Sequence, residues 1–292
     1  MTPKILSMQF SRSAKYLLSS KKILFGTIIV TGLILISILA PIIAPFDPNQ
    51  QNRKAPYDPP FWFSEGSTEH ILGTDSLGRD VFSRLIYSSQ AAVYVAVVGT
   101  IFTALIGSAV GVLAGYYRGR VDEVNMRIVD AWMSFPAVLL SIALISILGV
   151  GLQNVALAVI VVDWSRFARV IRSETLNIRE EDYIQAARSL GFSDFKIIRK
   201  EILPNLVPIL TVIVTIEMSI AITVEVLLSY VGLGVKAFTP SWGSMIAEGM
   251  GYVQTNWWVA TFPMITLILV ILSINILGEG AREKLDPKIQ TN

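Results

Sequence analysis

Long apolar runs separated by polar segments dominate the chain. A helix needs about 20 mostly apolar residues to cross a hydrocarbon core of roughly 30 Å, and six runs approach that length. They cover residues 23–46, about 90–117, about 127–149, about 152–167, about 205–232 and about 257–278. The pattern predicts an all-α membrane protein with six transmembrane helices.

The first run follows several basic residues, so a cleaved secretory signal peptide is an alternative interpretation. However, the run is longer than the roughly 7–15 apolar residues of a signal peptide, and proline follows the nearest small-residue site. We interpret it as a membrane anchor that ends where Pro41, Pro45 and Pro48 occur.

The Lys and Arg residues indicate the orientation of the spans, because cytoplasmic loops carry an excess of them. With the N-terminus inside, 19 of the 24 basic residues face the cytoplasm. The five outward residues are Arg53, Lys54, Arg79, Arg84 and Lys236. Both termini are therefore predicted to be cytoplasmic.

This orientation divides the chain into segments. Residues 1–22 and 281–292 are cytoplasmic tails, 23–46 are the first span, and 90–280 are a five-helix core that includes a charged cytoplasmic loop at 175–204. Residues 47–89 are an extracytoplasmic cap segment, rich in Pro, Asp and aromatic residues, which favours irregular structure. The outer loop at 235–256 has a similar composition.

Composition narrows the chemistry. Hydrophobic residues make up 53% of the chain and charged residues 16%, which is typical of a protein in a bilayer and not of a soluble globule. The chain has no Cys and one histidine, His70, so it has no disulfide, no thiolate metal site and no His pair for zinc or iron. A net charge of +2 is too small to indicate nucleic acid. A membrane-embedded hydrolase is also disfavoured, because the chain has no nucleophile motif beside the histidine.

The second run carries a stripe of small residues at every fourth position. They are Gly99, Thr103, Gly107, Gly111 and Gly115. Such a stripe lets two helix backbones approach closely, which is a main source of helix association in lipid. We expect the helix to pack through Gly107, Gly111 and Gly115. The alternative interpretation is that these are the scattered glycines common in any membrane helix.

Four carboxylates lie within or at the ends of the spans, at Asp130, Asp163, Glu217 and Glu225. An ionised group is costly there, so each should face water, a partner or an interface. Glu217 and Glu225 share a helix with several hydroxyl residues, and we expect that helix to line a pathway. Asp130 could instead pair with Arg127, one turn earlier, and Asp163 could lie near the headgroups.

Residues 73–80 nearly match the phosphate-binding pattern GxxxxGK[ST]. Arg79 replaces the lysine, and Asp80 places a negative charge where a hydroxyl should meet magnesium. The segment also lies on the outer side, so we expect a structured turn. No other phosphate loop occurs in the chain, and any use of ATP must come from a partner.

Residues 180–203, which we name the knob, predict two short helices. Three acidic residues begin the first helix, and Gly191 suits the left-handed position that ends it. Ser193 is the expected N-cap of the second helix, and Pro204 is expected to open the fifth span. We interpret the knob as a docking surface. The alternative is an amphipathic hairpin on the membrane, whose leading acids anionic lipid would repel.

At this point the residues resemble a known family. Gln185-Ala186-Ala187, followed by Gly191 and then Leu203-Pro204, resembles the "EAA" loop by which permease subunits of ABC importers dock on their ATPases. Stretches at residues 70–84, 225–234, 240–243 and 275–287 resemble signatures of the dipeptide/oligopeptide/nickel class, in its second, shorter permease subunit. The resemblance extends from the first span to residue 287.

This resemblance implies the type I (MetI-like) permease fold of ABC importers. It also implies a heterodimer with a homologous permease in a prokaryotic cell membrane, with two ATPases inside and a solute-binding protein outside. The chain itself would hold no cofactor and no catalytic residue, because the ATPases bind ATP and Mg. The transported solute would be a peptide, nickel, a metal chelate or a similar small solute.

The resemblance further implies residue roles. The ATPase-coupling residues would be Tyr183, Gln185, Ala186, Ala187, Leu190, Gly191, Phe192, Phe195, Leu203 and Pro204. The translocation path or gate would contain Glu217, Ala221, Glu225 and Ser229, and the binding-protein contact would contain Asp75, Arg79 and Trp242. Two positions depart from the family pattern: Gln185 replaces the Glu of the loop's name, and Asp163 replaces a small residue before Trp164.

An ion-coupled secondary transporter or channel remains the alternative function, with Glu217 and Glu225 as proton sites. It would work from this chain alone and depend on a proton gradient. The importer would need its partners and be sensitive to vanadate.

Overall fold

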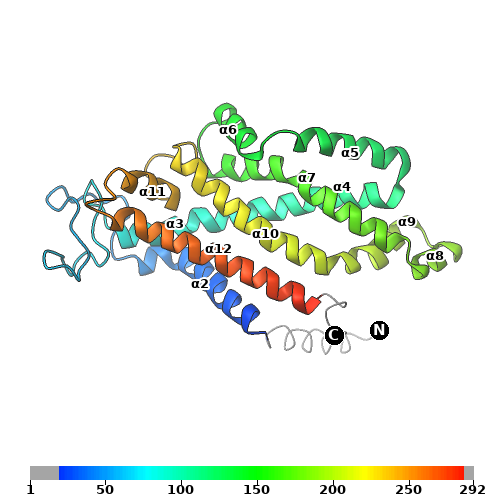
Figure 1. Ribbon diagram of the computed structural model, residues 1–292, viewed down its shortest axis with the longest axis horizontal. Coiled ribbons are helices and arrows are strands. Elements are labelled where there is room, and N and C mark those ends of the chain that lie inside the picture. The colour runs from blue at the N-terminus through cyan, green and yellow to red at the C-terminus, as the bar shows by residue number, and fades with distance from the viewer. Residues whose placement is uncertain (1–19, 286–292) are drawn as a thin grey trace.

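The apolar runs form long helices that lie side by side along one axis (Figure 1). The computed structural model describes residues 20–285, and every regular element in that part of the chain is helical. The elements are α2 (Lys21–Ile43), α3 (Val81–Tyr94), η1 (Val95–Gly99), α4 (Thr100–Tyr117), α5 (Gly119–Met133), α6 (Ala137–Leu148), α7 (Leu152–Arg179), α8 (Asp182–Ser189), α9 (Asp194–Ile197), η2 (Ile198–Ile202), α10 (Leu203–Tyr230), α11 (Trp242–Met250) and α12 (Trp258–Leu285). The predicted all-α class is confirmed.

The two ends of the bundle differ. The knob forms one end, and residues 44–80 together with α11 and its flanking loops form the other, which we name the cap end (Figure 1). The start of α2 lies beside the end of α12, where Lys22 donates to Glu279 at 3.0 Å and to Glu283 at 2.7 Å. Both of these helix ends lie toward the knob end of the bundle (Figure 1).

Four helices of the described chain are long and apolar enough to cross a membrane: Lys21–Ile43, Val81–Tyr117, Asp194–Tyr230 and Trp258–Lys284. The bent pair α5 and α6 would add a fifth if it counts as one span. The expected span at about 152–167 is not one of these apolar helices. Its helix, α7, carries three charged residues, Asp163, Arg166 and Arg169, within its first 18 positions. The count of six crossings is therefore not confirmed.

The expected span at 127–149 is wrong as a single helix. It is broken between α5 and α6, whose axes differ by 84°. Pro136 has no N–H to donate, and a residue before proline, here Phe135, avoids the helical region. These two local restrictions end α5 at Met133, and α6 restarts at Ala137.

The second span begins at Val81, nearer the N-terminus than the expected start at about Gln90. Asp80 caps it, because its carboxylate accepts the backbone N–H of Ser83 at 2.7 Å. The first turns contain buried polar residues such as Arg84 and Ser88, whose partners lie inside the protein. Hydropathy alone therefore does not identify these turns as part of the span. As a result, the irregular part of the cap segment is shorter than the expected 47–89. The outer loop at 235–256 also contains a helix, α11.

Pro41 lies inside the last turn of α2 and does not end it; the helix continues to Ile43. Proline cannot donate to the carbonyl four residues earlier, which here belongs to Ser37. The side-chain amide of Gln90 donates to that carbonyl at 3.0 Å. A residue of α3 thus satisfies the backbone acceptor that the proline leaves free.

The glycine stripe of α3–α4 packs against α7 of the same chain. A Cβ at Gly107 would lie 2.4 Å from the Phe167 Cβ, and one at Gly115 would lie 2.7 Å from the Thr175 Cβ. At Gly111 the nearest atom would be the Ala168 carbonyl oxygen, at 2.7 Å. Only glycine permits this approach of the two helix backbones.

Candidate functional site

The knob is held by a helix-ending motif at Gly191. This residue has φ +79°, in the left-handed region that glycine adopts at low cost. The Phe192 N–H donates to the Ala187 carbonyl at 3.1 Å, and the Gly191 N–H donates to the Arg188 carbonyl at 2.9 Å. These two bonds are the Schellman pattern. Ser193 occupies the N-cap position of α9 as expected, although its side chain makes no capping bond.

The second knob helix continues without a break into the fifth span. Residues 194–230 form one helix of 37 residues, with the π-helical segment η2 inside it. Pro204 lies in the first turn of α10, as expected, but α10 follows η2 without a break. At 1.5 Å per residue this helix is about 55 Å long, more than the roughly 30 Å of a hydrocarbon core. A displacement of the knob would be transmitted directly to α10.

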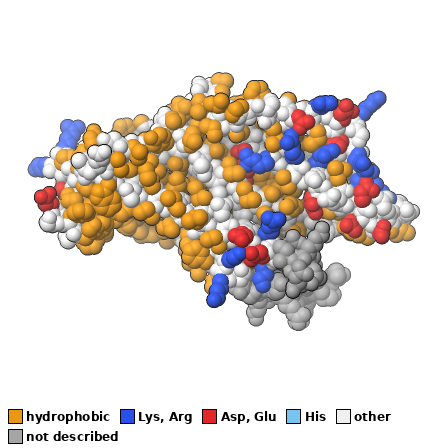
Figure 2. Space-filling view, viewed as in Figure 1, with side chains coloured by type: hydrophobic (Ala, Val, Ile, Leu, Met, Phe, Trp, Pro, Cys, Tyr) orange, Lys and Arg blue, Asp and Glu red, His pale blue; other side chains and the backbone are white. Residues whose placement is uncertain are grey.

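The knob buries an apolar core and exposes apolar side chains. Ile184, Ala187, Ile197 and Ile202 are buried, whereas Leu190 is 75% and Phe195 is 71% exposed. Among the ten predicted coupling residues, Ala187 is the one that is buried; the exposed set also contains Tyr183, Gln185, Ala186, Gly191, Phe192, Leu203 and Pro204. Charged side chains gather at this end of the molecule (Figure 2). An exposed apolar group in polar surroundings is typical of a protein-docking surface.

Two polar residues brace the knob. The Gln185 amide donates to the Arg179 carbonyl at 3.1 Å and so ties α8 to the end of α7. A glutamate there could not donate when ionised, which gives the departure at this position a local role. The Asn205 amide donates to the Tyr183 hydroxyl at 3.2 Å. Partial burial, with Glu181 and Glu201 nearby, raises the pKa of Tyr183 above its ordinary value.

The residues expected along a path lie inside the bundle. Glu217 and Glu225 are each 1% exposed, and Ala221 and Ser229 are also buried. The Ser229 hydroxyl donates to Glu225 Oε1 at 2.7 Å. These four residues lie on α10 and, in this conformation, none of them faces open solvent.

Glu217 belongs to a cluster that sequence reasoning did not identify. Arg166 of α7 donates to Asp163 Oδ1 at 2.8 Å and to Glu217 Oε2 at 3.3 Å. Asp163 is 3% exposed, so its carboxylate faces the protein interior.

Two further arginines of α7 form ion pairs with α5. Arg169 donates to Asp130 at 2.5 Å, so Asp130 does not pair with Arg127 as the sequence suggested. Arg172 forms a two-pronged ion pair with Asp122, with one contact of 2.5 Å. The sequence contained a signal for this charged face of α7, because arginine recurs at every third position from 166 to 172.

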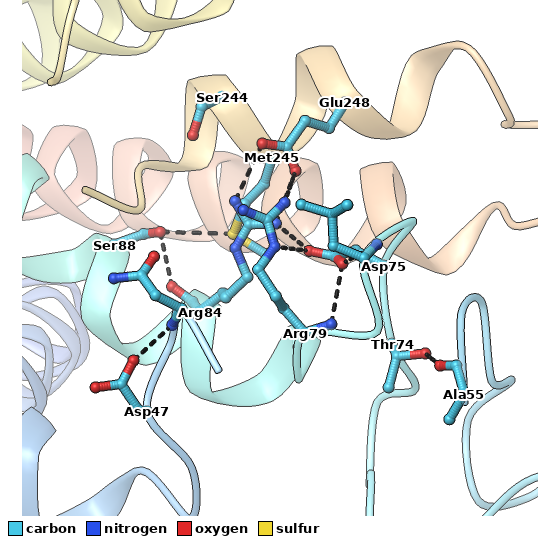
Figure 3. Close-up of polar contacts among 12 residues, drawn as sticks. Asp47, Ala55, Thr74, Asp75, Arg79, Arg84, Ser88, Ser244, Met245 and Glu248 are labelled. Carbon is cyan, nitrogen blue, oxygen red and sulfur yellow. Dashed lines mark hydrogen bonds and ion pairs between the residues drawn. The ribbon is translucent and has the colours of Figure 1, made fainter. Parts of the chain in front are cut away.

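The cap end contains an ion-pair cluster, formed by the buried residues Asp75, Arg79 and Arg84 and the partly exposed Glu248 (Figure 3). Glu248 Oε2 of α11 accepts from both Arg79 and Arg84, at 2.7 Å each. Asp75 pairs with the same two arginines, and its Oδ1 accepts the backbone N–H groups of Leu77 and Arg79. The near match to a phosphate loop is thus a structured turn whose charges are neutralised within the chain.

This cluster changes the role expected of three residues. Asp75 and Trp242 are each 1% exposed, and Arg79 is 7% exposed. Trp242 donates its indole N–H to the Leu85 carbonyl at 3.1 Å. Direct contact with a binding protein does not fit this burial; the three residues instead hold α11 and the cap segment together. Glu248 and Arg84, which complete the cluster, were not predicted as site residues.

Among residues 20–285, no group of three or more His, Asp or Glu side chains is placed to hold a metal ion.

Comparisons with known proteins agree with these features. Residues 107–291 match the family model for the binding-protein-dependent transport system inner membrane component. Residues 9–60 match the N-terminal TM domain of oligopeptide transport permease C. The dipeptide transport system permease protein DppC of Haemophilus influenzae is 36% identical over 94% of this chain and 93% of its own length. The glutathione transport system permease protein GsiD of Pectobacterium atrosepticum is 38% identical over 81% of this chain and 80% of its own.

A solved structure shows the same fold. A chain of the MetNI methionine ABC transporter, in an inward-facing conformation, superposes with a TM-score of 0.60 at 23% identity. The match covers 70% of this chain and 97% of that chain.

Proposed function

The chain belongs to the family of inner-membrane components of binding-protein-dependent transport systems, and from this premise we propose that it is the permease subunit of an ATP-driven peptide importer. A homologous second permease would complete the path, two ATPases would bind ATP and Mg, and an extracytoplasmic binding protein would deliver the solute. Its place is a prokaryotic inner membrane, which it crosses several times, with both termini and the knob proposed to be cytoplasmic.

The observation that carries this proposal is the exposed apolar surface of the knob. Leu190 and Phe195 project from a pair of short helices that follows α7 after a turn at Glu180 and Glu181 and continues into α10. A surface of this kind serves a docking partner and costs free energy without one. The ATPases are the partners that the family requires, and the continuous helix would carry their movement to α10.

A short peptide is the solute that the relatives support best. The two relatives described above are named for dipeptide and glutathione transport, and glutathione is itself a tripeptide. Nickel and metal chelates have no support from these relatives, and an ion-coupled carrier has none from the family.

Aspartate substitutions in the knob test the proposal. Leu190→Asp and Phe195→Asp should leave the permease folded, because both side chains project into solvent. They should abolish co-purification of the ATPases and vanadate-sensitive uptake of dialanine by the reconstituted transporter. Phe238→Asp, at an equally exposed apolar residue of the cap end, is the matched control and should retain both. Normal uptake by both knob variants, or uptake that a proton gradient drives without ATP, would refute the assignment.

A further inference from the structure

The cluster of Asp163, Arg166 and Glu217 is short of one cation. Two buried carboxylates share a single guanidinium. Glu217 Oε1 is fully buried and has no hydrogen-bond partner in the described chain. An unpaired carboxylate oxygen in an apolar interior is costly, so the site favours an additional positively charged donor.

We propose that Asp163 and Glu217 form a binding site for a primary ammonium group, the α-amino group of the transported peptide. An ammonium is a compact cation with three N–H donors, so it can reach Glu217 Oε1 and balance the extra negative charge at once. A divalent metal ion would need more ligands than this site offers among the described residues.

Arg166 is placed to yield to an incoming ammonium. Its contact with Glu217 is 3.3 Å, against 2.8 Å for its contact with Asp163, and its side chain is 41% exposed. The next ion pair along α7, between Arg169 and Asp130, contains one cation and one carboxylate and is balanced within itself. Arg166 therefore covers Glu217 in the empty site and can swing away when a second cation arrives.

The two carboxylates lie on the two helices that the knob joins. Asp163 is on α7, which leads into α8, and Glu217 is on α10, which continues from α9. Any knob movement that shifts α7 against α10 changes the separation of these carboxylates. An ammonium that bridges them would favour one separation, and so the site would link solute binding to the ATPase cycle. This inference rests on the function proposed above, because it takes the solute to be a peptide.

Binding of labelled dialanine to the purified complete transporter in nanodiscs, without binding protein, tests the site. Alaninamide, which keeps the amino group and lacks the carboxylate, should compete with dialanine, whereas N-acetylalanine should not. Glu217→Gln and Asp163→Asn should each weaken dialanine binding at least about tenfold, as expected for the loss of a charge-assisted hydrogen bond. Asp130→Asn removes a carboxylate from another α7 ion pair and should change binding by less than about twofold.

Arg166→Gln separates binding from a purely structural role. If the cluster only braces α7 against α10, this variant should lose as much binding as Glu217→Gln. If the carboxylates bind the ammonium, it should bind dialanine as tightly as the unmodified chain or more tightly, because the competing guanidinium is gone. If Glu217→Gln does not assemble, Asp163→Asn and Arg166→Gln still give these opposite results.

The outcomes that overturn the inference differ from those that overturn the proposed function. Equal competition by N-acetylalanine, or unchanged binding in Glu217→Gln and Asp163→Asn with ATP-driven uptake intact, refutes the ammonium site alone. If dialanine binding is unchanged in Glu217→Gln and Asp163→Asn and uptake depends on a proton gradient, the carboxylates bind a proton and not an ammonium group, which also refutes the site. Absence of any ATP-driven dialanine uptake by the unmodified transporter refutes the proposed function first.

Discussion

Replacing Gly107 with alanine tests the close contact between α4 and α7. The added Cβ would lie 2.4 Å from both the Phe167 Cβ and the Trp164 carbonyl oxygen. Because carbon atoms pack favourably at about 3.5–4.0 Å, the helices would have to separate by about 1 Å. Overpacking of this kind costs about 1–3 kcal/mol. The higher helix propensity of alanine recovers at most about 1 kcal/mol.

The expected net loss is about 0–2 kcal/mol, which lowers the Tm of the purified permease by up to about 8 °C, whereas the control below gains the helix propensity without the clash. Thermal unfolding monitored by size-exclusion chromatography would measure it. Gly32→Ala in α2 is the matched control, because no atom lies within 4 Å of its added Cβ. Gly99→Ala should fall between them, since its nearest neighbour is a Val159 methyl group at 3.2 Å. Equal Tm values for the Gly107 and Gly32 variants would refute the packing argument.

Three further substitutions examine the knob and the cap end. Gly191→Asp should leave abundance in the membrane near normal but abolish uptake, because a side chain at φ +79° costs about 1–2 kcal/mol and shifts the knob without a clash; wild-type uptake would contradict this. Glu248→Gln should lower stability by about 1–3 kcal/mol and make the cap end more sensitive to protease, because Arg79 and Arg84 lose a shared carboxylate. Exposed Glu69→Gln is its control, and identical digestion of the two would count against the cluster. Gln90→Leu should cost about 1–3 kcal/mol, because the Ser37 carbonyl loses its donor, whereas exposed Gln153→Leu should be neutral in the same unfolding assay.

Local patterns in the sequence were sufficient for several features. The apolar runs at α2 and α12 and the left-handed end of α8 at Gly191 follow from hydropathy and backbone preference, which depend on neighbouring residues. The small-residue stripe likewise predicted that α4 packs closely on another helix, although not that α7 is the partner. The break at Pro136 had a local signal too, but the apolar run outweighed it in the prediction.

Charge placement was beyond local reasoning. The first turns of α3 appeared polar because their partners are distant in sequence: Arg84 meets Glu248, 164 residues later. The same limit left open that Asp130 pairs with Arg127 and led to the expectation that Arg79 contacts a binding protein, whereas the fold pairs Asp130 with Arg169 and buries Arg79.

The sequence by itself determined that this chain is a helical membrane protein with a two-helix knob, because helix length, hydropathy and glycine geometry are properties of contiguous residues. The tertiary structure alone decided which charges meet. Arg166 reaches Glu217 across 51 residues of sequence, and only the packing of α7 on α10 brings them together. In a low-dielectric interior an ion pair forms at the separation that the helices impose, so its partners cannot be read from either helix alone.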